Sequence, residues 1–257
     1  KDAGVDAVKI QSYTPDTMTI KSNREDFLIK NGLWKGRTLY DLYQEAHTPF
    51  EWHERIFKYA KDLEITIFSS PFDETAVDLL ETLDTPAYKI ASFELVDLPL
   101  IAYIAKKKKP ILMSTGMASL SEIGEALEAA CSNGCNEIAL FHCISSYPTP
   151  IDQANINAIS LLKREFNVEV GLSDHTPGNL TSIVATSIGA SLIEKHFTLS
   201  RDDGGVDSAF SLEPTEMRVL VENVKSAFSA LGDGIFRRSK AEDENKIFRR
   251  SLYFVEN

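Results

Sequence analysis

Short apolar runs recur along the chain, and segments with helical spacing separate them. Runs rich in β-branched residues and bounded by polar or turn residues indicate buried strands. They lie at residues 7–12, 65–72, 87–92, 110–115, 138–143, 168–174 and 191–198. The clearest amphipathic segments lie at residues 73–84, 120–130, 151–166 and 214–231. Strands that alternate with returning helices in this way predict an α/β fold with a parallel sheet.

The regular alternation favours a (β/α)8 TIM barrel over a doubly wound sheet, and seven of the strands that a closed barrel needs are visible. Residues 1–10 read as the end of a helix, a glycine cap at Gly4 and a strand, much as residues 188–190 lead into the last strand. We therefore expect a barrel that lacks its first strand, in a chain that begins within the barrel.

The predicted domain organisation follows from the ends of this pattern. Residues 1–231 are expected to form the catalytic barrel domain. Residues 232–257 contain glycines and then a charged stretch, and residues 251–254 read as the start of another strand. We expect this segment to be a linker and the start of a C-terminal domain that is absent.

The connection at residues 13–50 is much longer than the others and carries Trp34 and a Tyr- and Leu-rich segment at 39–43. Long loops at the C-terminal face of a barrel often cover the substrate. An insert that only packs against a neighbouring helix is the alternative.

Composition and charge narrow the classes of protein. The chain has 257 residues, 43% of them hydrophobic, and a net charge of −11. This charge repels a phosphate backbone, so we expect no nucleic-acid partner, and an anionic ligand needs a local cationic pocket. There is no long apolar run and no signal peptide, which predicts no membrane partner and a cytoplasmic location. Three cysteines are too few for a disulfide framework, and we expect free thiols.

Charged residues recur on the predicted strands, whose C-terminal ends carry the chemistry in barrels. Lys9 and Gln11 share one face of the first strand because they are two residues apart. Lys89 occupies a similar place on the third strand. A lysine inside a barrel needs a negative partner, which is either an anionic ligand or a barrel carboxylate such as Glu194.

Hydroxyl and carboxyl groups follow several strands, namely Ser70, Ser92, Glu94, Ser114 and Ser173. Converging lysines, hydroxyls and free backbone N–H groups suit a phosphate ester. A single serine of this kind is more often a helix N-cap, so the prediction depends on several of them coinciding at strand ends.

His175 and His196 end two adjacent strands, so their imidazoles are expected to meet. Two neutral imidazoles with open positions suit a divalent ion such as Mn²⁺, Fe²⁺ or Zn²⁺. Ordinary hydrogen-bonded barrel histidines are the alternative. Asp207 lies in a glycine-hinged loop after the last strand. It either contacts sugar hydroxyls, transfers a proton near the metal, or caps a helix.

Eight motifs, in order along the chain, resemble those of the sialic acid synthase family. They are Val8-Lys-Ile-Gln11, Phe68-Ser-Ser-Pro-Phe72, Tyr88-Lys-Ile-Ala-Ser92, Ser114-Thr-Gly-Met117, Tyr147-Pro-Thr-Pro150, Gly171-Leu-Ser-Asp-His175, Ile193-Glu-Lys-His-Phe197 and Phe210-Ser-Leu212. The resemblance covers residues 1 to about 231. Within the family, residues 32–40, 48–53 and 91–94 are most similar to the pseudaminic acid synthases.

The resemblance implies a reaction and a cofactor. Phosphoenolpyruvate would condense with an amino-sugar aldehyde, 2,4-diacetamido-2,4,6-trideoxy-L-altrose, to give pseudaminic acid and phosphate. N-acetylneuraminate synthase and legionaminate synthase are the nearest alternatives. The implied cofactor is a divalent metal, Mn²⁺ in the first place, with Mg²⁺ or Co²⁺ as alternatives.

The resemblance also implies a role for each matching residue. His175 and His196 would hold the metal, and Lys9, Lys89 and Asp207 would be the catalytic groups. Around the substrates, the implied set is Gln11, Ser70, Ser92, Glu94, Ser114, Tyr147 and Ser173. The lysines and serines would surround phosphoenolpyruvate, Gln11, Tyr147 and Asp207 would face the sugar, and Glu94 would support the site.

Three departures from the family pattern limit what the resemblance implies. The family's catalytic glutamate on the first strand has no counterpart, and its C-terminal antifreeze-like domain, which lends an arginine to the partner subunit, is missing. Ser145 stands where the neuraminate enzymes carry an asparagine. We expect a domain-swapped homodimer at full length and an inactive fragment. Alternatives of other classes are a Schiff-base aldolase using Lys89 or Lys9, and a non-catalytic sugar-binding barrel.

Overall fold

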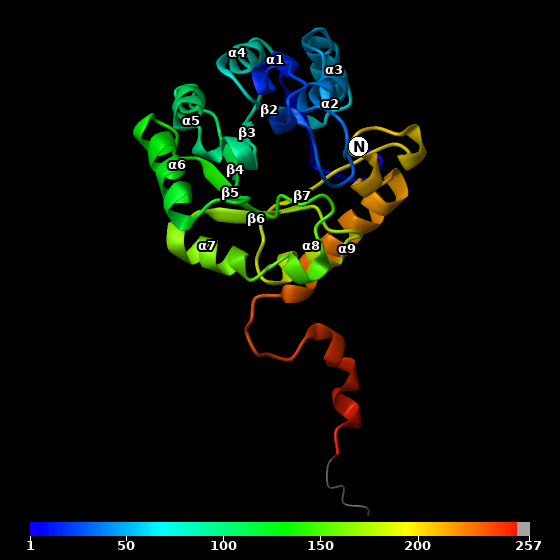
Figure 1. Ribbon diagram of the computed structural model, residues 1–257. Helices are drawn as coiled ribbons and strands as arrows, with labels where there is room; N and C mark the ends of the chain where they lie inside the picture. Colours follow the sequence, from blue (N-terminus) through cyan, green and yellow to red (C-terminus); the bar gives the residue numbers. More distant parts are fainter. Residues whose placement is uncertain (251–257) are drawn as a thin grey trace, which may run out of the picture.

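A single curled parallel sheet organises the chain in the computed structural model, which describes residues 1–250. Its strands follow one another in sequence order: β1 (Ala7–Ser12), β2 (Thr66–Pro71), β3 (Tyr88–Ile90), β4 (Ile111–Ser114), β5 (Ile138–Cys143), β6 (Glu169–Asp174) and β7 (Ile193–Lys195). Figure 1 shows the sheet bending into a half-barrel with the helices around its outer side. The predicted α/β fold with a parallel sheet is confirmed.

Nine α-helices lie in the described residues. They are α1 (Pro15–Met18), α2 (Leu39–Ala46), α3 (Phe50–Asp62), α4 (Glu74–Thr82), α5 (Leu98–Ala105), α6 (Leu120–Ser132), α7 (Ala158–Phe166), α8 (Leu180–Ser187) and α9 (Pro214–Leu231). Short 3₁₀ helices are η1 (Glu25–Phe27), η2 (Ser92–Val96), η3 (Ile151–Gln153), η4 (Arg201–Asp203), η5 (Ser208–Phe210), η6 (Lys240–Glu242) and η7 (Glu244–Phe248). None of these helices is long and apolar enough to cross a membrane.

The core lies between the outer face of the sheet and the surrounding helices. Ile90 and Ile111 from the sheet and Leu80, Ile101 and Ile104 from the helices are completely buried. Burying each such side chain contributes about 1.5–3 kcal/mol, so the apolar stripes of the helices hold them against the strands.

One predicted helix, at residues 151–166, is two elements in the structure. The segment begins with η3 and resumes as α7, and Asn155 between them has a left-handed backbone with φ 44°. A left-handed residue interrupts the run of helical hydrogen bonds, and asparagine adopts this conformation more easily than most residues. The prediction of one continuous helix was therefore wrong.

Both ends of the sheet agree with the sequence pattern. Gly4 (φ 81°) donates its N–H to Lys1 O at 2.7 Å before β1, and Gly189 (φ 99°) donates to Thr186 O at 3.0 Å before β7. Within residues 1–250, β1 and β7 do not pair with each other.

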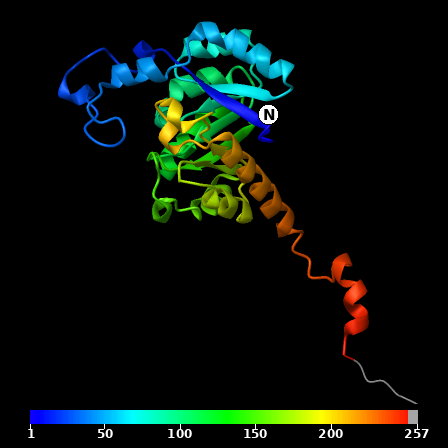
Figure 2. The same ribbon diagram turned by 90° about the vertical axis from the view of Figure 1, so that its right-hand side faces the viewer.

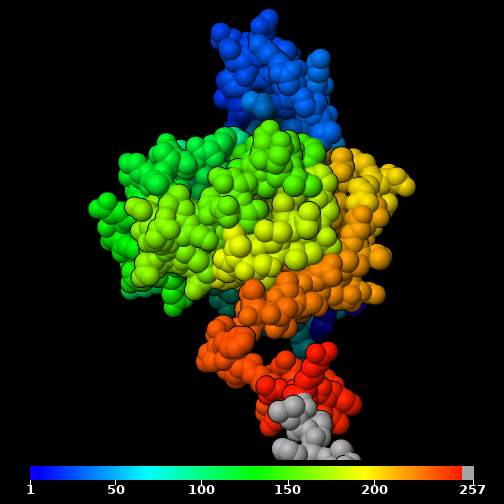
Figure 3. Space-filling view, turned by 90° about the horizontal axis from the view of Figure 1, so that it is seen from below, coloured from blue at the N-terminus to red at the C-terminus, as the bar shows by residue number. Residues whose placement is uncertain are grey.

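Two long segments extend away from the sheet, one near each end of the described chain. Residues 13–50 stand out from the barrel, and residues 232–250 lead away from α9 (Figures 2 and 3). The strand predicted at residues 251–254 lies outside the described residues.

Candidate active site

The ends of β6 and β7 bring two histidines together. His175 follows the last residue of β6, and His196 follows the last residue of β7, so parallel pairing places both at one edge of the sheet. The centroids of the two rings are 5.2 Å apart. Both side chains thus face the same small volume.

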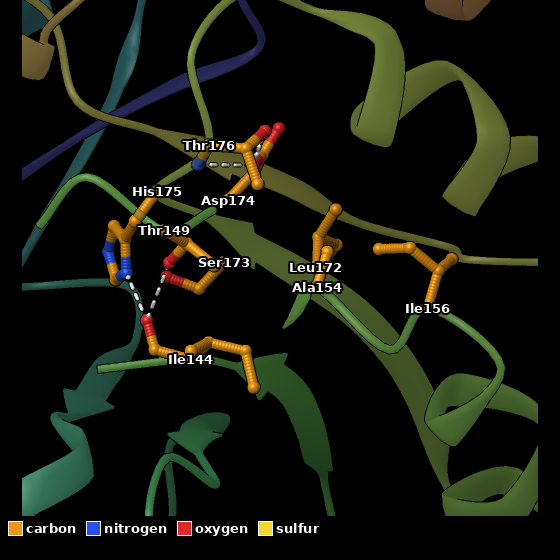
Figure 4. A pocket seen from close by; sticks show the side chains of 9 residues that line it. All are labelled: Ile144, Thr149, Ala154, Ile156, Leu172, Ser173, Asp174, His175 and Thr176. Atoms are coloured by element: carbon orange, nitrogen blue, oxygen red, sulfur yellow. Dashed lines mark hydrogen bonds between the residues drawn. The ribbon is translucent and has the colours of Figure 1, made fainter. Parts of the chain in front are cut away.

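A backbone carbonyl fixes the orientation of His175. Its Nδ1 donates to Ile144 O at 2.9 Å, because a carbonyl oxygen only accepts. When the ring is neutral, the other nitrogen, Nε2, keeps a lone pair, as in histidines that bind metals in proteins. Burial opposes protonation of His175, but its contacts with Cys143 and Ile144 outweigh burial and raise its pKa. Thr149 steadies the loop, since its N–H donates to His175 O at 2.9 Å and its hydroxyl donates to Ile144 O at 3.3 Å. Figure 4 shows this arrangement beside a cavity of about 10 Å³, which has room for one water molecule.

His196 lies against the loop that follows β7. Its Nδ1 is 3.5 Å from Oδ2 of Asp207. Burial, and then the neighbouring His175 and Lys9, lower the pKa of His196 to about 3, so this imidazole is neutral at physiological pH. Burial also raises the pKa of Asp207. A cavity of about 260 Å³ lies beside them, with Val206 in its lining.

Two lysines share one carboxylate inside the half-barrel. Nζ of Lys9 is 3.0 Å from Oε2 of Glu194, and Nζ of Lys89 is 3.7 Å from Oε1. Lys89 also donates to Oγ of Ser114 at 2.6 Å, and Ser173 donates to Glu194 at 2.8 Å. The barrel carboxylate that the sequence left as an alternative is thus the partner of both lysines. With both lysines protonated, this cluster of two ammonium groups and one carboxylate carries a net positive charge.

The buried ion cluster shifts the pKa values of its members. Burial lowers the pKa of Lys89 to about 8, although Glu194 opposes this effect. Burial alone would raise the pKa of Glu194, but Lys89 and Lys9 hold it well below its usual range. Glu194 therefore stays ionised, while the charge on Lys89 is the one that responds to neutral and mildly alkaline pH.

Three buried polar atoms near this cluster have no hydrogen-bond partner in the described residues: Oγ of Ser70, Oε2 of Glu94 and Oγ of Ser145. Native proteins rarely leave such atoms unpaired, so a ligand or water is expected to satisfy them. Oγ of Ser92 accepts the N–H of Gly116 at 3.2 Å, and a Cβ on that glycine would lie only 2.6 Å from this hydroxyl. The backbone thus approaches the pocket as closely as glycine allows.

Gln11 lies on β1, paired in register with Ser70 of β2. It makes no side-chain hydrogen bond within residues 1–250 in this structure, unlike Lys9 two residues earlier on the strand. Its amide is therefore free to pair with a ligand.

An aromatic wall borders the histidine pair. The ring of Tyr147 is 4.4 Å from His175 and 6.1 Å from His196, and Phe210 is 5.0 Å from His196. Trp34, from the insert at residues 13–50, lies 6.2 Å from Tyr147. The sequence motif identified Tyr147 as a site residue. Nothing in the sequence near Trp34 predicts that its ring lies against this wall.

A second ion pair, which the sequence analysis missed, lies next to both histidines. Nζ of Lys195 is 3.0 Å from Oδ2 of Asp174, and both side chains are almost completely buried. Thr176, Thr181 and Ser182 also donate to Asp174. The signal was present in the sequence, since an aspartate and a lysine immediately precede the histidines of adjacent strands.

Comparison with known proteins places these residues in a family. Residues 1–236 match the NeuB family. The chain belongs to the NeuB family. It is 47% identical, over 98% of its length and 74% of the relative, to a protein of Campylobacter jejuni named pseudaminic acid synthase. It is 43% identical, over 100% of its length and 76% of the relative, to a Helicobacter pylori protein of the same name.

A solved structure supports the fold of this NeuB-family chain. An N-acetylneuraminic acid synthetase from Leptospira borgpetersenii, crystallised with citrate, superimposes with a TM-score of 0.84 at 28% identity. The match covers 98% of this chain and 83% of the other. The expected membership of the sialic acid synthase family is confirmed.

Proposed function

We propose that this chain is the catalytic barrel of a pseudaminic acid synthase, which condenses phosphoenolpyruvate with 2,4-diacetamido-2,4,6-trideoxy-L-altrose. The observation that carries the proposal is the imidazole pair beside a buried cluster of two lysines and one glutamate, in a chain so similar to proteins with this name. N-acetylneuraminate and legionaminate synthesis are the alternatives within the family.

In the proposed reaction, the lysine pocket binds the anionic phosphoenolpyruvate and the aromatic wall contacts the sugar. The methylene carbon of phosphoenolpyruvate forms a bond to the aldehyde carbon, whose oxygen takes up a proton. Water adds to the former enol carbon, and phosphate leaves as the C–O bond breaks. Lys9, Lys89 and Ser114 would bind the anionic groups of phosphoenolpyruvate, and Asp207 would contact sugar hydroxyls or move a proton.

The histidine pair fits a divalent metal ion. The Nδ1–H of His175 is used on Ile144 O, which leaves Nε2 of the neutral ring for a metal ion, and His196 is neutral because it is buried. Within residues 1–250, no group of three or more His, Cys, Asp or Glu side chains has metal-site geometry, so the proposed ion would rest on these two histidines alone among such side chains. We propose Mn²⁺, with Mg²⁺ or Co²⁺ as alternatives, which when bound would polarise the aldehyde as a Lewis acid.

We further propose the organisation of the full-length enzyme. Within residues 1–250, β1 and β7 each have one unpaired edge, which suits one more strand that closes an eight-stranded barrel, and the curated relatives are longer than this chain. We propose that a C-terminal antifreeze-like domain follows, that the enzyme is a domain-swapped homodimer, and that it acts in the cytoplasm.

An assay of phosphate release tests the proposal. The full-length protein with Mn²⁺ is incubated with phosphoenolpyruvate and, in separate reactions, each of three aldehydes: the proposed sugar, the legionaminate precursor and N-acetylmannosamine. We expect release with the proposed sugar at a kcat/KM at least about tenfold above the other two. Release with none of them would reject a synthase of this family, and a preference for another sugar would reassign the substrate.

A Schiff-base aldolase is a second candidate, favoured by one observation. Burial lowers the pKa of Lys89 to about 8, and a lysine of this kind is a better nucleophile at neutral pH. Borohydride with pyruvate would trap a covalent adduct on Lys89 if this activity were present. The synthase proposal expects no adduct and a loss of activity on chelation.

A further inference from the structure

Trp34 joins two segments that are far apart in the sequence. Its Nε1 donates to the carbonyl of Val206 at 3.0 Å, across 172 residues. Val206 lines the cavity of about 260 Å³ that His196 and Asp207 also line. The indole of Trp34 therefore brings the insert at residues 13–50 to the edge of the proposed sugar site.

Backbone hydrogen bonds order the loop that carries Trp34. Leu28 and Thr38 form an antiparallel bridge at its neck. Within the loop, the N–H of Ile29 donates to Arg37 O at 2.9 Å, and the N–H of Gly36 donates to Ile29 O at 2.8 Å. These bonds hold the tip of the loop in one position, so the indole is presented in advance of any ligand.

At the tip of this loop, Trp34 is more buried than its neighbour Leu33. The neighbouring Leu33 is 52% exposed, whereas Trp34 is partly buried between Tyr147 and Phe210, at ring distances of 6.2 Å and 6.5 Å. Both partners also contact the histidine pair. Trp34 thus forms the outer part of the aromatic wall, one ring further from the histidines.

We propose that Trp34 is a specificity residue for the sugar, and that it favours an aldehyde whose far end is a methyl group over one that ends in a hydroxymethyl group. The inference rests on the proposed function. With the aldehyde carbon at the histidines and the hydroxyls near Asp207, an extended six-carbon chain about 6 Å long carries its last carbon toward the outer wall. Trp34 forms part of the apolar surface of that wall.

The chemistry of the indole explains the direction of the preference. Its single polar group, Nε1–H, is already bonded to Val206 O, so no donor remains for a sugar hydroxyl. A methyl group packs against this surface, whereas a hydroxyl loses its hydrogen bonds to water there. An apolar wall of this kind discriminates by about 10- to 100-fold.

Steady-state kinetics of the full-length metal-loaded enzyme test the proposal. The 6-deoxy sugar and its 6-hydroxy counterpart are compared for the wild type, Trp34→Ala, Trp34→Phe and the control Trp52→Ala, whose side chain is 57% exposed on α3. We expect Trp34→Ala to raise the KM of the 6-deoxy sugar about tenfold, to leave the KM of phosphoenolpyruvate unchanged and to remove the preference. Trp34→Phe should keep most of the preference, and the control should match the wild type.

The outcomes separate this inference from the proposed function. If the wild type turns over but Trp34→Ala keeps both its sugar KM and its preference, the specificity role is wrong and the function stands. If the KM of phosphoenolpyruvate rises equally, Trp34 acts on the fold and not on the sugar, and the role is again wrong.

If the wild type releases no phosphate, a binding measurement still decides the inference. The chain has two tryptophans, so in Trp52→Phe its fluorescence comes from Trp34. The unreactive alditol of the 6-deoxy sugar should shift this emission, and the shift should be absent in Trp34→Phe. No shift in Trp52→Phe would overturn the sugar-contact role.

Discussion

The ionisation of Glu94 gives a prediction whose size follows from the structure. Within residues 1–250, Oε2 of Glu94 is buried without a hydrogen-bond partner, and burial, with a smaller contribution from Asp97, raises the pKa of its carboxyl from 4.5 to about 7. Between these two pH values the folded protein keeps a proton that the unfolded chain has released. Stability therefore falls as pH rises from 4.5 toward 7 and is constant above it, with a total loss of about 3 kcal/mol at about 1.4 kcal/mol per pH unit.

Glu94→Gln removes the ionisation and nearly keeps the shape. We expect the variant to match the wild type in free energy of unfolding at pH 4.5, where the native carboxyl is neutral, and to exceed it by about 3 kcal/mol at pH 8.5. Urea unfolding of both proteins across this range measures the difference. Glu128→Gln, which changes an exposed carboxyl on α6, is the matched control and should shift stability by less than about 0.5 kcal/mol at every pH. A difference between Glu94→Gln and wild type that does not change with pH would refute the reasoning.

Three further predictions concern the ion pair, the close backbone approach and the metal. Lys195→Met leaves Asp174 buried with its hydroxyl donors but no cation, and should cost about 3 kcal/mol in urea unfolding, against less than about 1 kcal/mol for the more exposed Lys163→Met. Gly116→Ala places a Cβ against a serine hydroxyl and should raise the KM of phosphoenolpyruvate roughly tenfold; an unchanged KM would show that the pocket is not the anion site. His196→Ala should weaken Mn²⁺ binding at least about tenfold by calorimetry, and wild-type affinity would exclude this histidine as a ligand.

The sheet was predictable because its signal is local. Apolar runs with β-branched residues gave all seven strands, and the alternation of side chains placed Lys9 and Lys89 on the inner face, where both meet Glu194. The exact partners were less predictable, because a lysine on an inner face fits a ligand and a carboxylate equally well. The sequence named Glu194 as one possible partner, and only the distances show that both lysines reach it.

Features that depend on the backbone path or on distant segments had no such signal. The hydrogen bond from His175 to Ile144 O uses a backbone carbonyl, which every residue has. No residue type in the sequence therefore predicts it. The contact of Trp34 with Val206 joins residues that are 172 positions apart in the sequence. The break at Asn155 competes with an otherwise helical pattern, and a single left-handed residue decided it.

Charge links these observations to the choice of substrate. The chain carries a net charge of −11, yet inside the half-barrel two lysines face one glutamate, and His196 is kept neutral by burial. A phosphate or carboxylate that enters this pocket meets the remaining positive charge in a place where little water screens it. The acidic surface disfavours large polyanions such as nucleic acids, whereas a small anion that fits within the barrel gains the full attraction. The same burial keeps His196 neutral, so its lone pair stays available beside the anion pocket for the proposed metal ion.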